Sequence, residues 1–191
     1  MMSEPIRAKI EEAAAQAQAA TRNEMEYHQA RVLILINSFV RGQNKPFSGL
    51  TKLAKLDFLL RYPNFMERLL PNGQESWSEE TRPTSMERQA VESRMIRYKY
   101  GPWDDRYYPI LGALVGRRLA EYVPRSSGLA IRLTVDGRRL ARALAAAPEW
   151  EIVAARAELL REHFNISGNR LKDMIYTYLP DAVDRPWRSE I

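Results

Sequence analysis

The chain has 191 residues, of which 45% are hydrophobic and 28% are charged. This balance is typical of a globular protein and differs from that of a disordered or collagen-like chain. There is no cysteine, which excludes disulfides, thiolate zinc sites and cysteine nucleophiles. The net charge is +5, and residues 94–142 carry eleven Lys and Arg against four acidic residues. Such a basic segment can meet nucleic acid or an acidic protein surface.

No segment has the pattern of a membrane or export signal. Residues 1–20 lack a long apolar core, so we do not expect a signal peptide. The longest strongly apolar run, residues 32–36, is far too short to span a bilayer. We therefore expect a cytoplasmic protein that makes no membrane contact.

The first part of the chain predicts helices. Residues 1–23 form a weakly apolar amino-terminal helical arm. Residues 24–41 follow as a helix that is apolar on most sides, which predicts burial. Ser48 is the expected cap of a shorter helix over 49–61, and residues 64–70 add about two further turns.

The next stretch alternates between polar and aromatic segments. A polar insertion near 71–84 predicts a flexible loop, and a loop of this length is a candidate partner surface. Ser85 is the expected cap of a helix over 86–97. Residues 98–100 have the pattern of a short strand, which Gly-Pro at 101–102 is expected to close.

The most informative pattern comes next. Asp104 or Asp105 is expected to cap a helix over 106–119. The wing, residues 120–135, alternates as two strands joined by a turn. Thr134 ends the second strand and is placed to cap the following helix through its hydroxyl group.

This order of helix, helix, strand, helix, β-hairpin and helix is that of a winged helix. We therefore predict a protein that is mainly α with a small β-hairpin, with a winged-helix domain over 24–146. The arm at 1–23 and a helical pair with a tail over 147–191 are its amino- and carboxy-terminal helical extensions.

The helix before the hairpin holds the position of a recognition helix. A helix that reads DNA presents side chains able to bond base edges. The outward face here consists of Pro109, Gly112, Ala113 and Gly116, which cannot. Small residues let another element approach closely, so we interpret this face as a protein contact in preference to a DNA reader.

Arginines near the wing are the candidate nucleic-acid contacts: Arg106, Arg117, Arg118, Arg125 and Arg132. They could bind phosphates of double-stranded DNA without reading its sequence. The alternative is that these side chains belong to solvated helix faces and a solvated turn. Both interpretations stay open.

Residues 98–108 are dense in aromatic side chains, with Trp103 near the centre. Trp103 is a candidate partner contact, because Trp and Tyr anchor many interfaces. A stacked base is a second functional possibility. The alternative, which we favour, is that the rings fill the space under the turn.

Catalysis has little support in the sequence. His28 and His163 are far apart and neither has ligand spacing around it. Adjacent carboxylates such as Asp104 and Asp105 do not converge on a substrate as an acid–base pair does. No Gly-rich phosphate loop with Lys and Ser or Thr is present. We expect no catalytic residue, no metal and no cofactor.

Three segments carry a family resemblance. They are residues 30–37 (ARVLILIN), 49–63 (GLTKLAKLDFLLRYP) and 97–108 (RYKYGPWDDRYY), and the later run LKDMIYTYLP at 171–180 agrees with them. Over about residues 30–181 the chain resembles the middle component of bacterial three-component ABC-ATPase systems, which include the Lamassu antiphage systems.

The resemblance implies a small winged-helix subunit beside an SMC- or Rad50-like ATPase and an effector, often a nuclease. Such a subunit bridges the two partners and has no catalytic residues of its own. The competing hypothesis from another class is a winged-helix transcription regulator that binds DNA. A nuclease subunit is a third and weaker alternative.

Overall fold

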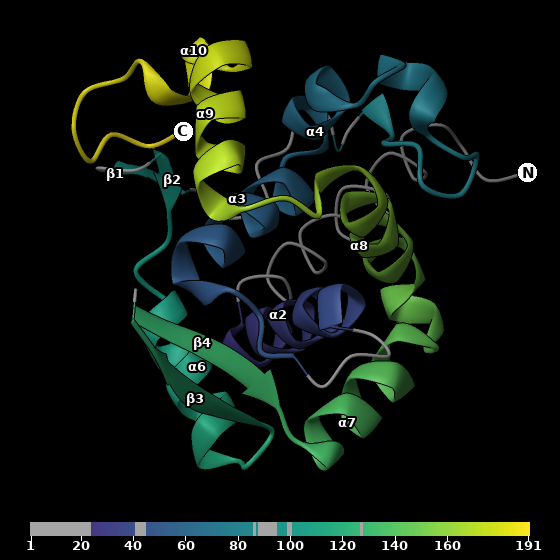
Figure 1. Ribbon diagram of the computed structural model, residues 1–191. Coiled ribbons are helices and arrows are strands. Elements are labelled where there is room, and N and C mark those ends of the chain that lie inside the picture. The colour runs from purple at the N-terminus through teal and green to yellow at the C-terminus, as the bar shows by residue number, and fades with distance from the viewer. Residues whose placement is uncertain (1–23, 41–44, 86, 88–94, 99–100, 127) are drawn as a thin grey trace, which may run out of the picture.

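The structure is a computed structural model that describes residues 24–40, 45–85, 87, 95–98, 101–126 and 128–191. The arm predicted at 1–23 and most of the helix predicted at 86–97 lie outside the described residues. The described chain is mainly helical, with two small antiparallel two-stranded sheets (Figure 1). This confirms the mainly α class with a small β-hairpin.

The elements follow in chain order. The helices are α2 (Met25–Val40), α3 (Gly49–Arg61), α4 (Pro63–Leu69), α6 (Tyr107–Gly116), α7 (Val135–Ala145), α8 (Glu151–Phe164), α9 (Gly168–Tyr178) and α10 (Pro180–Val183). Short 3-10 turns lie at η1 (Gly73–Ser76) and η2 (Pro148–Trp150). The strands are β1 (Ile96–Tyr98), β2 (Gly101–Trp103), β3 (Ala120–Arg125) and β4 (Gly128–Leu133).

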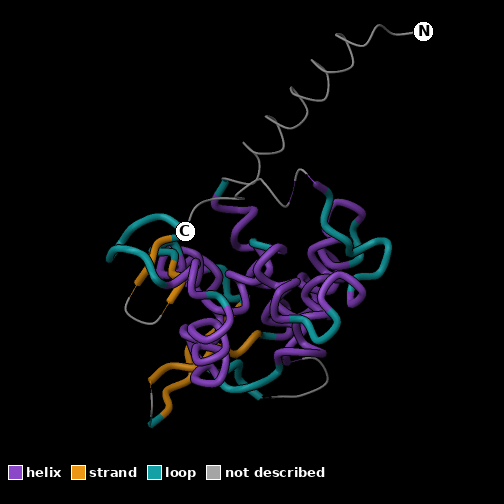
Figure 2. The backbone as a smooth tube through the Cα atoms, turned by 90° about the horizontal axis from the view of Figure 1, so that it is seen from above, coloured by secondary structure: helices purple, strands orange, loops and turns teal. Residues whose placement is uncertain are grey.

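Helix α2 is the centre of the fold. Its apolar run, residues 32–36, is fully buried, as the sequence predicts. It packs against α6, α7 and α8. The tube view shows a mainly helical body with the strands at its edge (Figure 2). Because water reaches almost none of its apolar surface, α2 is the element on which the other helices are organised.

The β-hairpin has a regular register from Ala120 opposite Leu133 to Arg125 opposite Gly128. Phe47, which lies between α2 and α3, pairs with Ile131 through two backbone hydrogen bonds of 2.7 and 3.0 Å. Phe47 therefore acts as a one-residue third strand, which joins the hairpin to the segment just before α3.

The junction between α6 and α7 is tight. Arg118 takes a positive φ of 57°, and the amide of Leu119 bonds the Leu114 carbonyl at 2.8 Å, which closes α6 with a left-handed cap. Thr134 caps α7 as predicted, since its Oγ1 accepts the amide of Gly137 at 3.0 Å. A Cβ at Gly137 would stand 1.9 Å from the Leu119 carbonyl oxygen, so only glycine allows this approach.

The small β1–β2 sheet differs from the prediction. The helix predicted over 86–97 does not extend to residue 97, because Ile96 lies in β1. Gly-Pro at 101–102, predicted to close a strand, instead begins β2. The reason is non-local: the last residues bond β1, with Arg97 N to Ser189 O at 2.8 Å and Ile191 N to Met95 O at 2.9 Å.

Two caps and one loop also differ from expectation. The Ser48 side chain makes no capping hydrogen bond. Thr84, rather than Ser85, exchanges bonds with Glu87 in the manner of a capping box. The polar stretch near 71–84 is anchored by Trp77, which is 4% exposed and donates Nε1–H to Glu67 at 2.8 Å. The prediction of a flexible loop does not account for this anchor.

The carboxy-terminal helices belong to the same core. Helix α8 packs against α2 and α3, and α9 packs against α3 and α4. One hydrophobic cluster includes residues from α2, α3, α6, α8 and α9. Among the described helices, none is long and apolar enough to cross a membrane.

Candidate interaction surface

Helix α6 separates into two faces. Its inward residues are buried: Tyr107, Ile110, Leu111 and Leu114. Its outward residues are exposed or half-buried: Pro109, Gly112, Ala113 and Gly116. A Cβ at Gly112 or Gly116 would meet no atom within 4 Å. The described part of the chain therefore does not use these two small residues for its own close packing.

The candidate arginines near the wing do not form one patch. Arg117 and Arg118 are exposed at the end of α6, and Arg125 is exposed at the hairpin tip. The length of β3 separates the two places by roughly 20 Å. Arg132 lies between them and pairs with Glu121 at 3.0 Å. The exposed arginines can still contact phosphates at separate points.

Arg106 has a different setting from the other candidates. Its guanidinium bonds Asp104 through Nη2 at 2.7 Å and Nε at 2.9 Å, and its Nη1 lies 2.7 Å from Nε2 of His28. The sequence placed it among the nucleic-acid contacts. In the structure most of the N–H donors of its guanidinium face a polar network within the protein, so few are left to bind phosphate.

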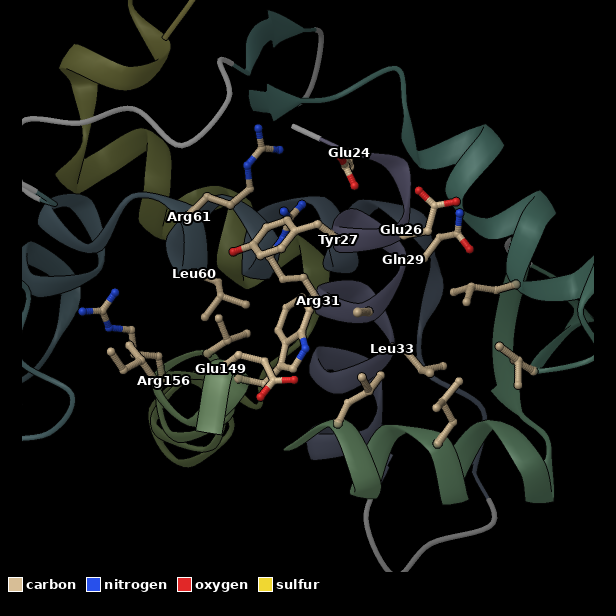
Figure 3. Close-up of a pocket in the computed structure, with 18 of the residues that line it drawn as sticks. Glu24, Glu26, Tyr27, Gln29, Arg31, Leu33, Leu60, Arg61, Glu149 and Arg156 are labelled. Atoms are coloured by element: carbon tan, nitrogen blue, oxygen red, sulfur yellow. The ribbon is translucent and has the colours of Figure 1, made fainter. Parts of the chain in front are cut away.

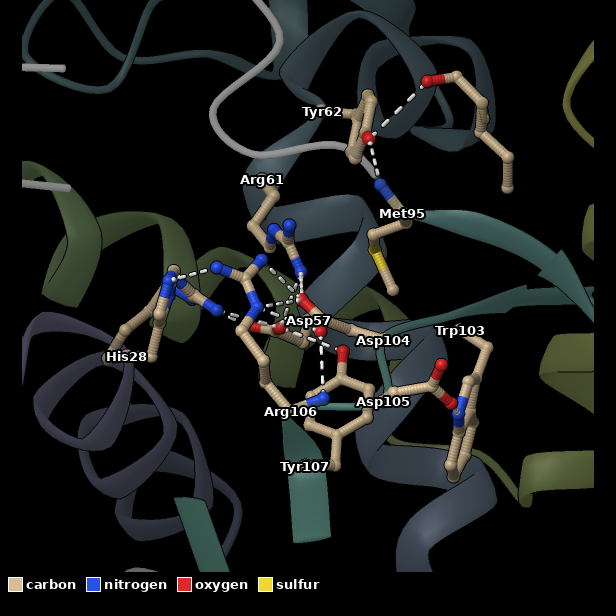
Figure 4. Close-up of polar contacts among 12 residues, drawn as sticks. His28, Asp57, Arg61, Tyr62, Met95, Trp103, Asp104, Asp105, Arg106 and Tyr107 are labelled. Carbon is tan, nitrogen blue, oxygen red and sulfur yellow. Dashed lines mark hydrogen bonds and ion pairs between the residues drawn. The ribbon is translucent and has the colours of Figure 1, made fainter. Parts of the chain in front are cut away.

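This network, the Asp57 cluster, consists of His28, Arg31, Asp57, Arg61, Asp104, Arg106 and Tyr107 (Figure 4). Asp57 is fully buried and accepts two hydrogen bonds from Arg31, at 2.8 and 3.0 Å. The Tyr107 hydroxyl donates a third at 2.8 Å. Burial alone would raise the pKa of Asp57, but the charges of Arg31 and Arg61 with these bonds lower it.

Asp104 completes the cluster from the chain segment before α6. It accepts a bond from Arg61 at 2.8 Å and one from the backbone amide of Arg106 at 3.0 Å. Burial opposes ionisation, yet the hydrogen bond from Arg106 and the charge of Arg61 hold the pKa of Asp104 well below its usual range. Arg106, and not Asp104 or Asp105 as predicted, is the residue before α6, and the helix has no side-chain cap. Asp104 is instead a buried counter-ion.

His28 lies between two guanidinium groups. Arg31 Nη1 is 2.8 Å from its Nδ1, and Arg106 Nη1 is 2.7 Å from its Nε2. A neutral imidazole has one acceptor nitrogen, so only one of these contacts is a hydrogen bond at a time. Burial and then the charges of Arg31 and Arg106 lower the pKa of His28 to about 3. The ring is neutral at pH 7.

The Asp57 cluster joins α2, α3 and α6, and its two carboxylates are paired with its arginines. It is therefore a structural core of polar side chains. The sequence reasoning missed it, although a signal was present. Arg31 and Asp57 each interrupt a strongly apolar helix, and buried charges are almost always paired.

A groove of about 630 Å³ runs between α2, α6, α7 and α8 (Figure 3). Much of its lining is apolar: Leu33, Leu114, Leu119, Leu140, Leu144 and Ile152. Tyr27 stacks on Trp150 at 4.9 Å in the middle of it. Charged residues of both signs also line the groove: Glu24, Glu26, Glu87 and Glu149 with Arg31, Arg61, Arg117 and Arg156. Since Leu140 and Ile152 are exposed, the groove is an open apolar surface with acidic and basic residues in its lining.

Trp103 is half-buried at the end of β2. Its ring lies 5.8 Å from Tyr98, 5.5 Å from Tyr107 and 5.8 Å from Tyr108, and its Nε1 donates to Asp105 at 3.0 Å. The ring thus packs under the turn, as the favoured interpretation has it. Tyr108 beside it is 64% exposed.

No group of three or more His, Asp or Glu that could hold a metal occurs among the described residues. The carboxylates of the Asp57 cluster already accept hydrogen bonds from its own arginines and from Tyr107. Comparison of the chain with protein-family models, with curated proteins and with solved structures finds no match.

Proposed function

We propose that the chain is a non-catalytic adaptor that bridges an SMC-like ATPase and an effector in a bacterial antiphage or antiplasmid complex. The kind of partners comes from the resemblance of residues 30–37, 49–63 and 97–108 to the middle component of such systems. The proposal also includes a cytoplasmic location and sequence-nonspecific contact with double-stranded DNA.

A winged helix is the fold we propose for the central part. The order α2, Phe47, α3, α6, β3 and β4 supports it, with Phe47 paired to Ile131. In this assignment α6 is the recognition helix and the β3–β4 hairpin is the wing. The segment between α3 and α6, residues 62–106, is then an insertion that carries α4 and the β1–β2 sheet.

The observation that carries the adaptor proposal is the outward face of α6. Gly112 and Gly116 are exposed and leave room for another backbone to approach. No side chain between residues 109 and 116 can bond a base edge. A recognition helix with this face is suited to packing against protein.

The groove supports the same proposal. It lies next to α6, and its exposed Leu140 and Ile152 are apolar residues that a partner would cover. An open apolar groove whose lining carries charges of both signs fits a partner segment with apolar residues.

Any DNA contact would involve phosphates alone. Arg117, Arg118 and Arg125 are the exposed cations that would make it. Such binding would weaken steeply with salt and would not distinguish between sequences. A clear preference for one palindromic duplex would instead support the transcription-regulator alternative.

The test is co-purification of the full chain with the products of the neighbouring genes. Gly112→Arg places a long side chain on the outward face of α6, where the described chain offers no clash. We expect it to reduce recovery of the ATPase or the effector by about tenfold or more, a loss of about 1.4 kcal/mol, without lowering the stability of the isolated chain.

The matched control is Ala143→Arg, which adds the same side chain to an exposed position of α7. It should leave recovery unchanged. Equal recovery of partners with Gly112→Arg and with the unaltered chain would contradict the proposal that α6 is the contact.

A further inference from the structure

Helix α3 carries two buried lysines, Lys52 and Lys55, that have no carboxylate partner among the described residues, and only Lys52 has a hydrogen-bond acceptor. Other buried arginines have carboxylate partners: Arg31 with Asp57, Arg61 with Asp104 and Arg156 with Glu87. Lys52 donates to Asn165 at 3.2 Å. Lys55 is 2% exposed, yet no acceptor or carboxylate in the described chain contacts its Nζ.

The surroundings of Lys55 make its charge more costly. Its Nζ lies 3.8 Å from the place of a Cβ on Gly101, in the small β1–β2 sheet. The one neighbouring charge that acts on it among the described residues is Lys172 of α9, which is also positive. Burial first and then Lys172 lower the pKa of Lys55 to about 8. The amine is still largely protonated at pH 7.

Lys55 lies at the wall of a cavity of about 240 Å³ between α3, β1–β2 and α6. The other lining residues are mostly aromatic or apolar: Leu50, Tyr98, Pro102, Trp103 and Tyr108, with Thr51 and Gly101. A buried ammonium in such a cavity is a single positive charge surrounded by ring faces and aliphatic groups.

We propose that this Lys55 cavity binds a carboxylate carried on an aromatic or apolar group. One carboxylate supplies the single negative charge that the buried ammonium lacks, in a charge-assisted hydrogen bond. Trp103 and Tyr108 then pack against the carrier. A phosphate dianion has twice the charge and finds one buried cation here. The proposal does not depend on the adaptor function.

The carboxylate can belong to a free organic acid or to an acidic residue within an apolar segment of a partner protein. Both have the same chemistry at Nζ. In either case binding needs the protonated amine, so affinity is highest below the pKa of Lys55 and falls as pH rises above it. Binding in turn raises that pKa.

The test uses the full chain with ¹³C-labelled lysine and follows the Lys55 resonance by NMR. The probes are 3-phenylpropionate, its uncharged amide 3-phenylpropionamide, and the capped peptide acetyl-Ala-Glu-Phe-amide. We expect a carboxylate probe to raise the pKa of Lys55 by about one unit or more, whereas the amide leaves it unchanged. The free acid and the peptide distinguish the two sources.

Variants assign the effect to this amine. Lys55→Met keeps the length of the side chain, and we expect it to weaken carboxylate binding by about tenfold or more, or 1.4 kcal/mol. Lys52→Met is the matched control, because it removes the neighbouring buried lysine of α3 and should leave the affinity within about twofold.

Several results would overturn the proposal. One is that neither carboxylate probe moves the Lys55 pKa at millimolar concentration. Another is that the amide binds as well as the acid. The third is that inorganic phosphate or thymidine monophosphate raises the Lys55 pKa more than either carboxylate does. The pKa readout needs no variant, so it decides the matter even if Lys55→Met folds poorly.

Discussion

Two neighbouring positions of α3 bury charge in opposite ways. Asp57 is surrounded by Arg31, Arg61 and Tyr107, and its charge is fully compensated. Lys55, two residues earlier, faces the β1–β2 sheet, and no carboxylate of the described chain contacts its amine. A compensated charge holds elements together, because any loss leaves its partners buried and unpaired. An uncompensated one opposes folding and leaves an interaction that a ligand can complete.

The largest effect expected is from Asp57→Asn. The amide keeps the shape but removes the negative charge that Arg31 and Arg61 share. We expect a loss of about 3–5 kcal/mol in the free energy of unfolding, because the buried Arg31 loses its counter-ion and the buried Arg61 keeps only Asp104. Urea denaturation followed by circular dichroism measures it.

Its control is Asp173→Asn, which breaks the exposed pair with Lys172. Exposed pairs contribute about 0–1 kcal/mol, so a small change is expected. If both variants lost the same amount of stability, the contrast between compensated and exposed charge would be wrong.

The second prediction concerns acid. The pKa of His28 is about 3 in the folded chain against 6.5 as its ordinary value. Between pH 3 and pH 6.5 the unfolded chain therefore binds more protons than the folded chain does. The free energy of unfolding consequently falls as pH drops from about 6.5 towards 3. The slope approaches about 1.4 kcal/mol per pH unit. Urea unfolding at pH 7, 6, 5 and 4.5 measures it.

His28→Gln should remove most of this slope between pH 6 and 5. The lowered pKa values of Asp57 and Asp104 act mainly near and below their ordinary value of 3.8, whereas Glu87, whose pKa is lowered from 4.5, adds its own loss of stability towards pH 4.5. An unchanged slope in the variant would show that His28 is not the group that titrates.

The smallest effect, and one of opposite sign, is expected from Lys55→Met. Removing a buried amine without a counter-ion should raise stability at pH 7 by about 1 kcal/mol. In the unaltered chain the folded pKa of about 8 lies below the ordinary 10.5, so stability should rise with pH across that window.

Lys55→Met should lose that rise, while Lys52→Met serves as the comparison because Lys52 has Asn165 as an acceptor. Thermal unfolding at pH 7, 9 and 10 provides the measurement. A destabilised Lys55→Met would mean that this amine has a stabilising partner after all.

Features set by nearby residues were predictable from the sequence. The burial of α2 follows from its apolar run at 32–36, and the Thr134 cap acts on Gly137 three residues later. The Asp57 cluster was not predictable in detail, because Arg31 and Asp57 are 26 residues apart and Arg61 and Asp104 are 43 apart. A pattern shows that such a charge needs a partner, but not which residue supplies it.

The candidate surface was predictable to a similar extent. The outward residues of α6 follow from helical spacing and are exposed or half-buried as expected. The groove was not anticipated, since it arises where α2, α6, α7 and α8 meet. Arg106 bonds Asp104 two residues earlier, which the sequence could have suggested, and His28 78 residues away, which it could not.

The contact of Gly137 with Leu119 has a mechanical consequence. The backbones at the end of α6 and the start of α7 are in direct contact. The Thr134 hydroxyl also donates a hydrogen bond to the carbonyl of Arg118 at 2.8 Å across the same junction. The junction therefore fixes the position of α7 relative to α6. Because Leu140 and Leu144 of α7 line the groove, the same junction also sets where the outward face of α6 lies relative to the groove.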